Sequence, residues 1–73
     1  MNSSGLKRKL EDIEARMAVL NGEGASLEGH LSSSGHPTEI AEFGKRLKKV
    51  NDELQTLEEQ WLAVSSELEA QLG

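Results

Sequence analysis

The sequence predicts an all-α fold, a two-helix antiparallel coiled-coil hairpin, from three observations. Two long runs of apolar residues each advance by alternating steps of three and four residues. A single turn-rich segment separates the two runs, and so short a connection returns the second helix along the first. Leu, Glu, Lys, Gln and Ala are abundant, whereas Phe43 and Trp61 are the only Phe, Tyr or Trp residues, which favours helices over sheets.

The first helix is expected over residues 6–31. Its apolar positions repeat every 3.5 residues on average, which keeps a narrow stripe facing a partner helix in a left-handed supercoil. Gly24 is the one member of the stripe that lacks an apolar side chain. The stripe consists of Leu6, Leu10, Ile13, Met17, Leu20, Gly24, Leu27 and Leu31.

Gly22 and Gly24 leave two interpretations of this helix open. In the first, the helix continues through both glycines, each of which costs ~1 kcal/mol relative to alanine. In the second, the helix stops near Leu20 with Gly22 as a left-handed cap, and a short turn restarts around residues 26–31.

Residues 32–38 are expected to form the loop, because they contain three serines, a glycine and the only proline of the chain. The second helix is expected over residues 39–71, with Thr38 as its N-cap and Glu39 in its first turn. Its apolar stripe has the same spacing as the first. That stripe consists of Ile40, Phe43, Leu47, Val50, Leu54, Leu57, Trp61, Val64 and Leu68.

The loop position also predicts which residues face each other across the hairpin. The expected layers are Leu31–Phe43, Leu27–Leu47, Gly24–Val50, Leu20–Leu54, Met17–Leu57, Ile13–Trp61, Leu10–Val64 and Leu6–Leu68. Three ion pairs should flank these layers, namely Lys9–Glu67, Arg16–Glu53 and Glu23–Arg46. At 1.5 Å per residue, the resulting arm should be roughly 40 Å long.

With 73 residues, the chain is expected to form one small domain over residues 6–73, preceded by a disordered lead-in over residues 1–5. The sequence has no cysteine, which excludes disulfides and thiolate sites. No apolar run approaches the roughly 18 residues of a membrane-spanning helix, so we expect no membrane contact, and the absence of cysteine fits a cytoplasmic location.

The sequence predicts no catalytic residue and no metal or cofactor site. His30 and His36 are the only histidines, and the ligand sets of zinc motifs do not accompany them. The thirteen Asp and Glu residues lie on solvated helix faces, and a two-helix arm lacks the partly dry pocket that acid–base catalysis requires.

Two basic clusters are candidate nucleic-acid-binding sites in a chain whose formal net charge is −5. The first consists of Lys45, Arg46, Lys48 and Lys49, and the second of Lys7, Arg8 and Lys9. Lys45, Lys48 and Lys49 fall on outward-facing heptad positions. The alternative interpretation is a solvated face that carboxylates four residues away neutralise, such as Asp52 for Lys48 and Glu53 for Lys49.

The segment Leu57-Glu58-Glu59-Gln60-Trp61-Leu62, followed by Ser65-Ser66-Glu67-Leu68-Glu69, resembles the end of the C-terminal domain of ABC-F ATPases of the Uup/YheS type. That domain is a helical hairpin with a late tryptophan in an acidic context, as in Glu58-x-x-Trp61. The resemblance covers nearly the whole chain after Gly5.

The resemblance implies a parent protein with two ATP-binding cassettes that acts in the cytosol on ribosomes or translation. ATP and Mg²⁺ would belong to those cassettes and not to this chain. The arm itself would contact nucleic acid, either DNA or ribosomal RNA, or the ribosome. The alternative function is that of a purely structural coiled coil for protein contact or self-association.

Overall fold

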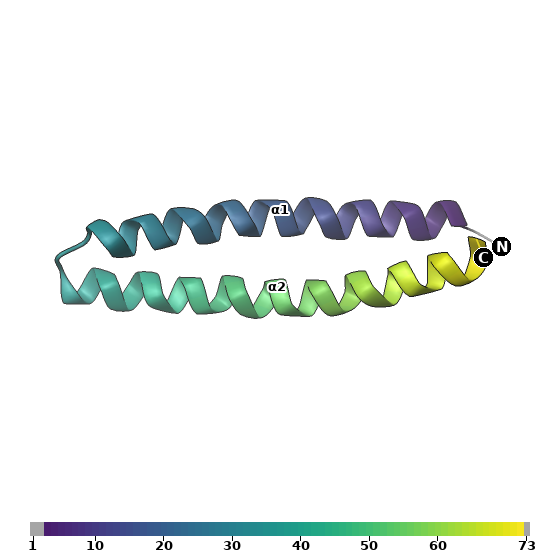
Figure 1. Cartoon of the computed structure of the whole chain (residues 1–73). Helices are drawn as coiled ribbons and strands as arrows, with labels where there is room; N and C mark the ends of the chain where they lie inside the picture. The colour runs from purple at the N-terminus through teal and green to yellow at the C-terminus, as the bar shows by residue number, and fades with distance from the viewer. Residues whose placement is uncertain (1–2, 73) are drawn as a thin grey trace.

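The computed structural model describes residues 3–72, which fold into two long helices. Helix α1 spans Ser3–Ser33 and helix α2 spans Pro37–Leu72. The helices lie side by side and run antiparallel, with the short loop at one end of the hairpin (Figure 1). No strand occurs within the described range, so the predicted all-α hairpin is confirmed.

Both helices are longer than the sequence predicted. The expected ranges were 6–31 and 39–71, so the loop shrinks from residues 32–38 to residues 34–36. Ser3, Ser4 and Gly5 are helical, which corrects the predicted lead-in for those three residues. Residues 1–2 of that lead-in and residue 73 lie outside the described residues. The arm is 54 Å long and 14 Å across, which exceeds the predicted roughly 40 Å because α2 alone has 36 residues.

Three serines at the end of α1 hydrogen-bond back to its last turns, where the sequence predicted a loop. The hydroxyl of Ser32 donates a hydrogen bond to the carbonyl of Glu28, and that of Ser33 donates one to the carbonyl of Gly29, each at 3.0 Å. The backbone N–H of Ser34 donates to the His30 carbonyl at 2.9 Å. The bond from Ser34 occupies the His30 carbonyl, one of the last four that the end of a helix otherwise leaves without partners, whereas the hydroxyls of Ser32 and Ser33 add bonds to carbonyls one turn earlier.

Helix α2 begins at Pro37 and not after a Thr38 N-cap, which corrects the predicted boundary. The first carbonyl that accepts a helical bond belongs to His36, from the N–H of Ile40 at 3.0 Å. Proline suits the first helical position because its φ is preset and its missing N–H would have no helical partner there. The hydroxyl of Ser34 stabilises the first turn of α2, because it donates a hydrogen bond to the Glu39 carboxylate at 2.9 Å and accepts one from the His36 N–H at 3.3 Å.

The predicted apolar stripes form the interface between the helices. Ile13, Leu20, Leu27, Val50 and Val64 are buried together with Gly24. With one exception, the other members of both stripes are partly buried. The exception is Ile40, which is 41% exposed because it lies in the first turn of α2, at the edge of the interface. The stripes therefore predicted the buried face of both helices.

Contacts across the interface agree with the predicted register. A Cβ placed on Gly24 would lie 3.6 Å from Val50 Cγ1, as expected for facing residues. Trp61 Nε1 donates a hydrogen bond to Glu14 Oε2 at 3.0 Å, which puts the indole beside the turn of α1 that carries Ile13. Leu20, Leu27 and Val50 form the centre of the core, against which Leu54 and Leu57 pack.

Helix α1 is continuous through its glycines. Neither Gly22 nor Gly24 has a positive φ, so neither forms a left-handed cap. Of the two interpretations, the structure supports a single helix, and a stop near Leu20 is wrong. Packing of Leu20 and Leu27 on both sides of the glycines explains how tertiary contacts overcome their low helix propensity.

Candidate functional site

The densest basic cluster lies on the exposed face of α2, in the half of the helix next to the loop. Lys45, Arg46, Lys48 and Lys49 are all exposed, and the heptad directs Lys45, Lys48 and Lys49 away from α1. Because Leu47 and Val50 of the same turns face the interface, the helix itself fixes the outward direction of the lysines. We call these four residues the α2 basic cluster.

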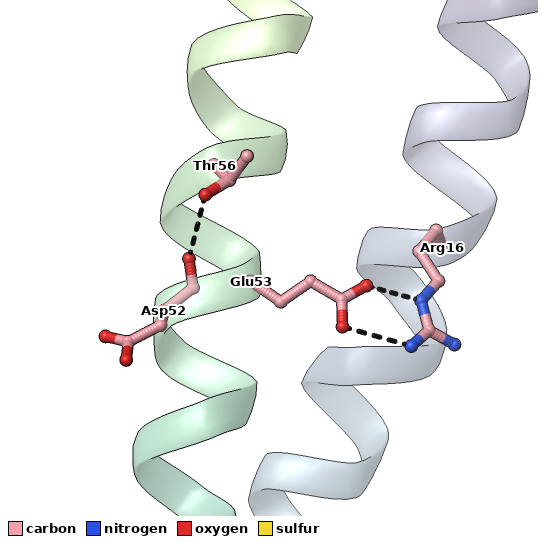
Figure 2. Close-up of polar contacts among 4 residues, drawn as sticks. All are labelled: Arg16, Asp52, Glu53 and Thr56. Carbon is pink, nitrogen blue, oxygen red and sulfur yellow. Dashed lines mark hydrogen bonds and ion pairs between the residues drawn. The ribbon is translucent and has the colours of Figure 1, made fainter.

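The balance of charge around this cluster depends on a contact between the helices. Arg16 of α1 donates two hydrogen bonds to the Glu53 carboxylate of α2, from Nε to Oε2 at 2.7 Å and from Nη2 to Oε1 at 3.2 Å (Figure 2). This confirms one of the three predicted interhelical ion pairs. Because Glu53 binds Arg16, it does not form the expected pair with Lys49 on its own helix.

The same contact shifts the pKa values of the Arg16 and Glu53 side chains. The hydrogen bond from Arg16 lowers the pKa of the Glu53 carboxyl group, and the positive charge of the guanidinium adds to that effect. In return, the hydrogen bond to Glu53 raises the pKa of Arg16, and the nearby charge of Glu23 contributes in the same direction. Glu53 therefore stays ionised and bound to Arg16 at neutral pH.

Two other members of the cluster have carboxylate partners. Lys48 Nζ lies 2.9 Å from Asp52 Oδ2, and Arg46 Nε lies 3.9 Å from Glu42 Oε1. Both pairs join residues four apart, and the sequence predicted the one between Lys48 and Asp52. Both are exposed, so each stabilises the helix only weakly. In the part of the chain that the structure describes, Lys45 and Lys49 have no ion-pair partner.

The second basic group lies far from the first. Lys7, Arg8 and Lys9 are in the first turns of α1, whereas the α2 basic cluster lies about two turns after the loop, so the antiparallel arrangement puts the groups in opposite halves of the arm (Figure 1). Lys7 and Arg8 line the same shallow surface hollow as Glu11 and Asp12, one turn further along α1. This end of the arm therefore presents mixed charge, and the structure does not unite the two predicted groups.

The other two predicted interhelical ion pairs are wrong. Among residues 3–72, neither Lys9 with Glu67 nor Glu23 with Arg46 forms an ion pair. Arg46 forms an ion pair with Glu42 of its own helix instead. Seven residues before Arg16 in α1 is Lys9, and seven residues after Glu53 in the antiparallel α2 is Gln60. The heptad repeat therefore places a neutral side chain opposite Lys9.

Two contacts of aromatic side chains were not predicted from the sequence. The indole of Trp61 bonds to Glu14 of α1 and not to an acidic neighbour in its own helix. At the loop end of the hairpin, His30 stacks on Phe43, with ring centroids 5.0 Å apart and ring planes 15° from parallel. Both Glu14 and His30 sit directly beside the apolar stripe of α1, which is the signal that could have identified them.

A shallow groove runs along the hairpin on the flank opposite the Arg16–Glu53 pair. Met17 and Leu54, both partly buried, lie at its floor, while amide and carboxylate side chains line its edges. Its volume is about 410 Å³. The edge residues are Asn21, Asn51, Gln55 and Glu58.

The residues described by the structure include no group of three or more His, Asp or Glu side chains placed to hold a metal ion. Over the same range, neither helix combines the length and apolar character needed to cross a bilayer. Residues 3–72 consist of the two helices and their loop, and they contain no ATP-binding cassette.

Comparison with known families gives one match. A family model described as the ABC transporter C-terminal domain matches residues 2–66, which include α1, the loop and most of α2. No curated protein sequence and no solved structure matches the chain.

Proposed function

Because this chain belongs to the ABC transporter C-terminal domain family, we propose that it is the coiled-coil arm of an ABC-F ATPase that contacts nucleic acid. The family match supports an accessory arm of an ABC protein, and the Glu58-x-x-Trp61 segment favours the ABC-F group among such proteins. In this proposal the arm has no catalytic role. ATP and Mg²⁺ bind the cassettes of the parent protein, which works in the cytoplasm on DNA, ribosomal RNA or the ribosome.

The observation that carries the proposal is the uncompensated charge of the α2 basic cluster. Lys45 and Lys49 point outward without a carboxylate partner among the described residues, although the whole chain is acidic. Phosphate groups are the natural partners for such lysines, because binding releases the counterions of the polyanion. Lys48 and Arg46 can join them by exchanging an exposed carboxylate for a phosphate at little cost.

The test compares two triple variants that lose the same charge. Replacing Lys45, Lys48 and Lys49 with glutamine removes the outward lysines of the cluster and leaves the apolar interface unchanged. The control replaces Lys7, Arg8 and Lys9 with glutamine, at the mixed-charge end of the arm. Binding of duplex DNA and structured RNA is titrated at two salt concentrations, together with the unmodified chain.

We expect the unmodified chain to bind with a dissociation constant of ~10⁻⁴–10⁻⁶ M. The variant at Lys45, Lys48 and Lys49 should bind every sequence more weakly, and its log–log salt dependence should flatten by about one unit per lost contact. The control should bind nearly as well as the unmodified chain. Equal loss in both variants would show a response to net charge alone, and this would refute a specific role for the cluster.

The alternative function is a structural coiled coil for contact with another protein or a second copy of the chain. The groove over Met17 and Leu54 favours it, because Asn21, Asn51 and Gln55 there have no side-chain hydrogen bond within residues 3–72 and are available to a partner. Absence of nucleic-acid binding by the unmodified chain, even at low salt, would favour this function.

A further inference from the structure

The loop end of the hairpin carries a stack of two rings from different helices. His30 lies in the last turn of α1 and Phe43 lies in the second turn of α2. Their ring centroids are 5.0 Å apart and their planes differ by 15°, so the rings lie almost parallel. Such an arrangement is a flat aromatic surface built by the hairpin itself, since the two residues are distant in sequence and meet only when the chain folds.

The two rings differ in their exposure. Phe43 is partly buried and packs against the core formed by Leu20, Leu27 and Val50, whereas His30 is exposed. The inner ring therefore anchors the stack to the core, and the outer ring is accessible to a third ring. A planar group that stacks on His30 would gain dispersion contacts on a surface whose orientation is already fixed.

Cationic side chains follow the stack directly along α2. Arg46 is three residues after Phe43 and therefore lies on the same side of α2, and Lys45, one position earlier, is next to it on the outward face. Two acidic residues of α2 near the stack already have partners, because Glu39 accepts a hydrogen bond from Ser34 and Glu42 pairs with Arg46. The carboxylate of Glu28 on α1 has no partner among the described residues. An aromatic surface next to cationic groups is the combination that binds a base together with its backbone phosphates.

The geometry points to a stacking site for an unpaired nucleobase on His30, with its neighbouring phosphates on Lys45 and Arg46. This inference rests on the proposed nucleic-acid function and makes it more specific. Bases inside a duplex are stacked on their neighbours and cannot reach His30, whereas bases in loops, bulges and single strands can. The arm should therefore prefer nucleic acid with unpaired bases over a fully paired duplex that has the same number of phosphates.

The experiment measures the affinity of the chain for two RNAs of equal length. One is a hairpin with 2-aminopurine in its single-stranded loop, and the other is a fully paired duplex. His30→Ala removes the outer ring, and His30→Phe keeps an aromatic ring without the imidazole. His36→Ala is the matched control, because His36 is an exposed histidine of the same end that takes part in no ring stack among the described residues.

We expect the unmodified chain to bind the RNA hairpin more tightly than the duplex and to change the 2-aminopurine fluorescence. His30→Ala should weaken hairpin binding by roughly 5- to 150-fold, the range for loss of one base-stacking contact, and should leave duplex binding unchanged. His30→Phe should retain most of the preference, and His36→Ala should bind both RNAs normally. Thermal unfolding of each variant checks that the hairpin remains folded.

Each contrary result identifies which proposal fails. If His30→Ala binds the RNA hairpin as tightly as the unmodified chain, or weakens hairpin and duplex binding equally, the stacking site is refuted. The proposed function then still stands if replacing Lys45, Lys48 and Lys49 weakens duplex binding. If the unmodified chain binds neither RNA, the proposed function fails and the stacking site with it. Binding of a tryptophan-containing peptide at His30 without RNA binding would assign this surface to protein contact instead.

Discussion

Arg16 and Glu53 join the two helices by a bidentate contact between residues that are 37 positions apart in the chain. The guanidinium group holds both carboxylate oxygens, at 2.7 and 3.2 Å. Without this contact, Glu53 would be the natural partner of Lys49, four residues earlier on the same exposed surface of α2. The interhelical contact therefore has a second effect, since it leaves Lys49, at the edge of the α2 basic cluster, without an ion-pair partner among residues 3–72.

Glu53→Gln should reduce the acid sensitivity of the arm. Since the pKa of Glu53 is lowered in the folded chain, its stabilising effect is fully present above the ordinary glutamate pKa of about 4.3 and is lost as pH falls through the lower folded value. The variant should therefore have a lower thermal midpoint than the unmodified chain at pH 7, and the difference should shrink below about pH 4. Circular dichroism melts between pH 7 and pH 2 measure both effects.

The control for this prediction is Glu59→Gln, which removes an exposed carboxylate without an ion-pair partner in the described part of α2. Its thermal midpoint should follow that of the unmodified chain at every pH. If Glu53→Gln and Glu59→Gln gave the same pH profile, the contact with Arg16 would contribute nothing to stability.

Gly24→Ala and Gly22→Ala should both stabilise α1, because neither glycine has a positive φ and alanine is the better helix former by about 0.5–1 kcal/mol. Gly24→Ala should stabilise more, since its methyl group would lie at ordinary contact distances of 3.6 Å from Val50 and 3.8 Å from Leu47. The new methyl at Gly22 would meet no other side chain. Urea unfolding at 25 °C separates the two variants.

Gly35→Ala is the matched control, because this glycine lies in the loop with open space around it. It should change the free energy of unfolding by less than either helical substitution. Destabilisation by Gly24→Ala would mean that the helices approach each other more closely at Gly24 than an alanine side chain allows.

Leu20→Ala and Leu62→Ala should differ strongly in their effect on stability although they delete the same atoms. Leu20 is 2% exposed at the centre of the interface, whereas Leu62 is 59% exposed on the outer face of α2. The first substitution should cost about 2–5 kcal/mol, because it opens a cavity in the core. The second should change stability by about 0.5 kcal/mol or less.

Thermal and urea unfolding of the two leucine variants test this difference. In so small a chain, the loss at Leu20 is a large fraction of the total stability, so this variant should be partly unfolded at room temperature. Similar unfolding curves for both variants would contradict the assignment of the buried stripe.

The buried face was predictable from the sequence because it depends on a local repeat. Apolar residues at steps of three and four must fall on one side of a helix, whatever surrounds it, and the loop position then determines which layers can meet. The helix ends were less predictable. They depend on hydrogen bonds of Ser34 to the His30 carbonyl and to Glu39, and serine is equally common in loops.

The sequence alone determined the fold class, the antiparallel direction, the register and the location of the basic residues. All of these follow from short-range spacing and from the length of one connection. Only the tertiary structure decided which partner a long exposed side chain contacts when several are within reach. Of the three ion pairs expected between the helices, the described residues form Arg16–Glu53 alone, while Arg46 pairs with Glu42, Trp61 bonds to Glu14 and His30 stacks on Phe43. The alternatives differ by a fraction of a kcal/mol between rotamers, so the heptad positions give the candidates for each contact but not the choice among them.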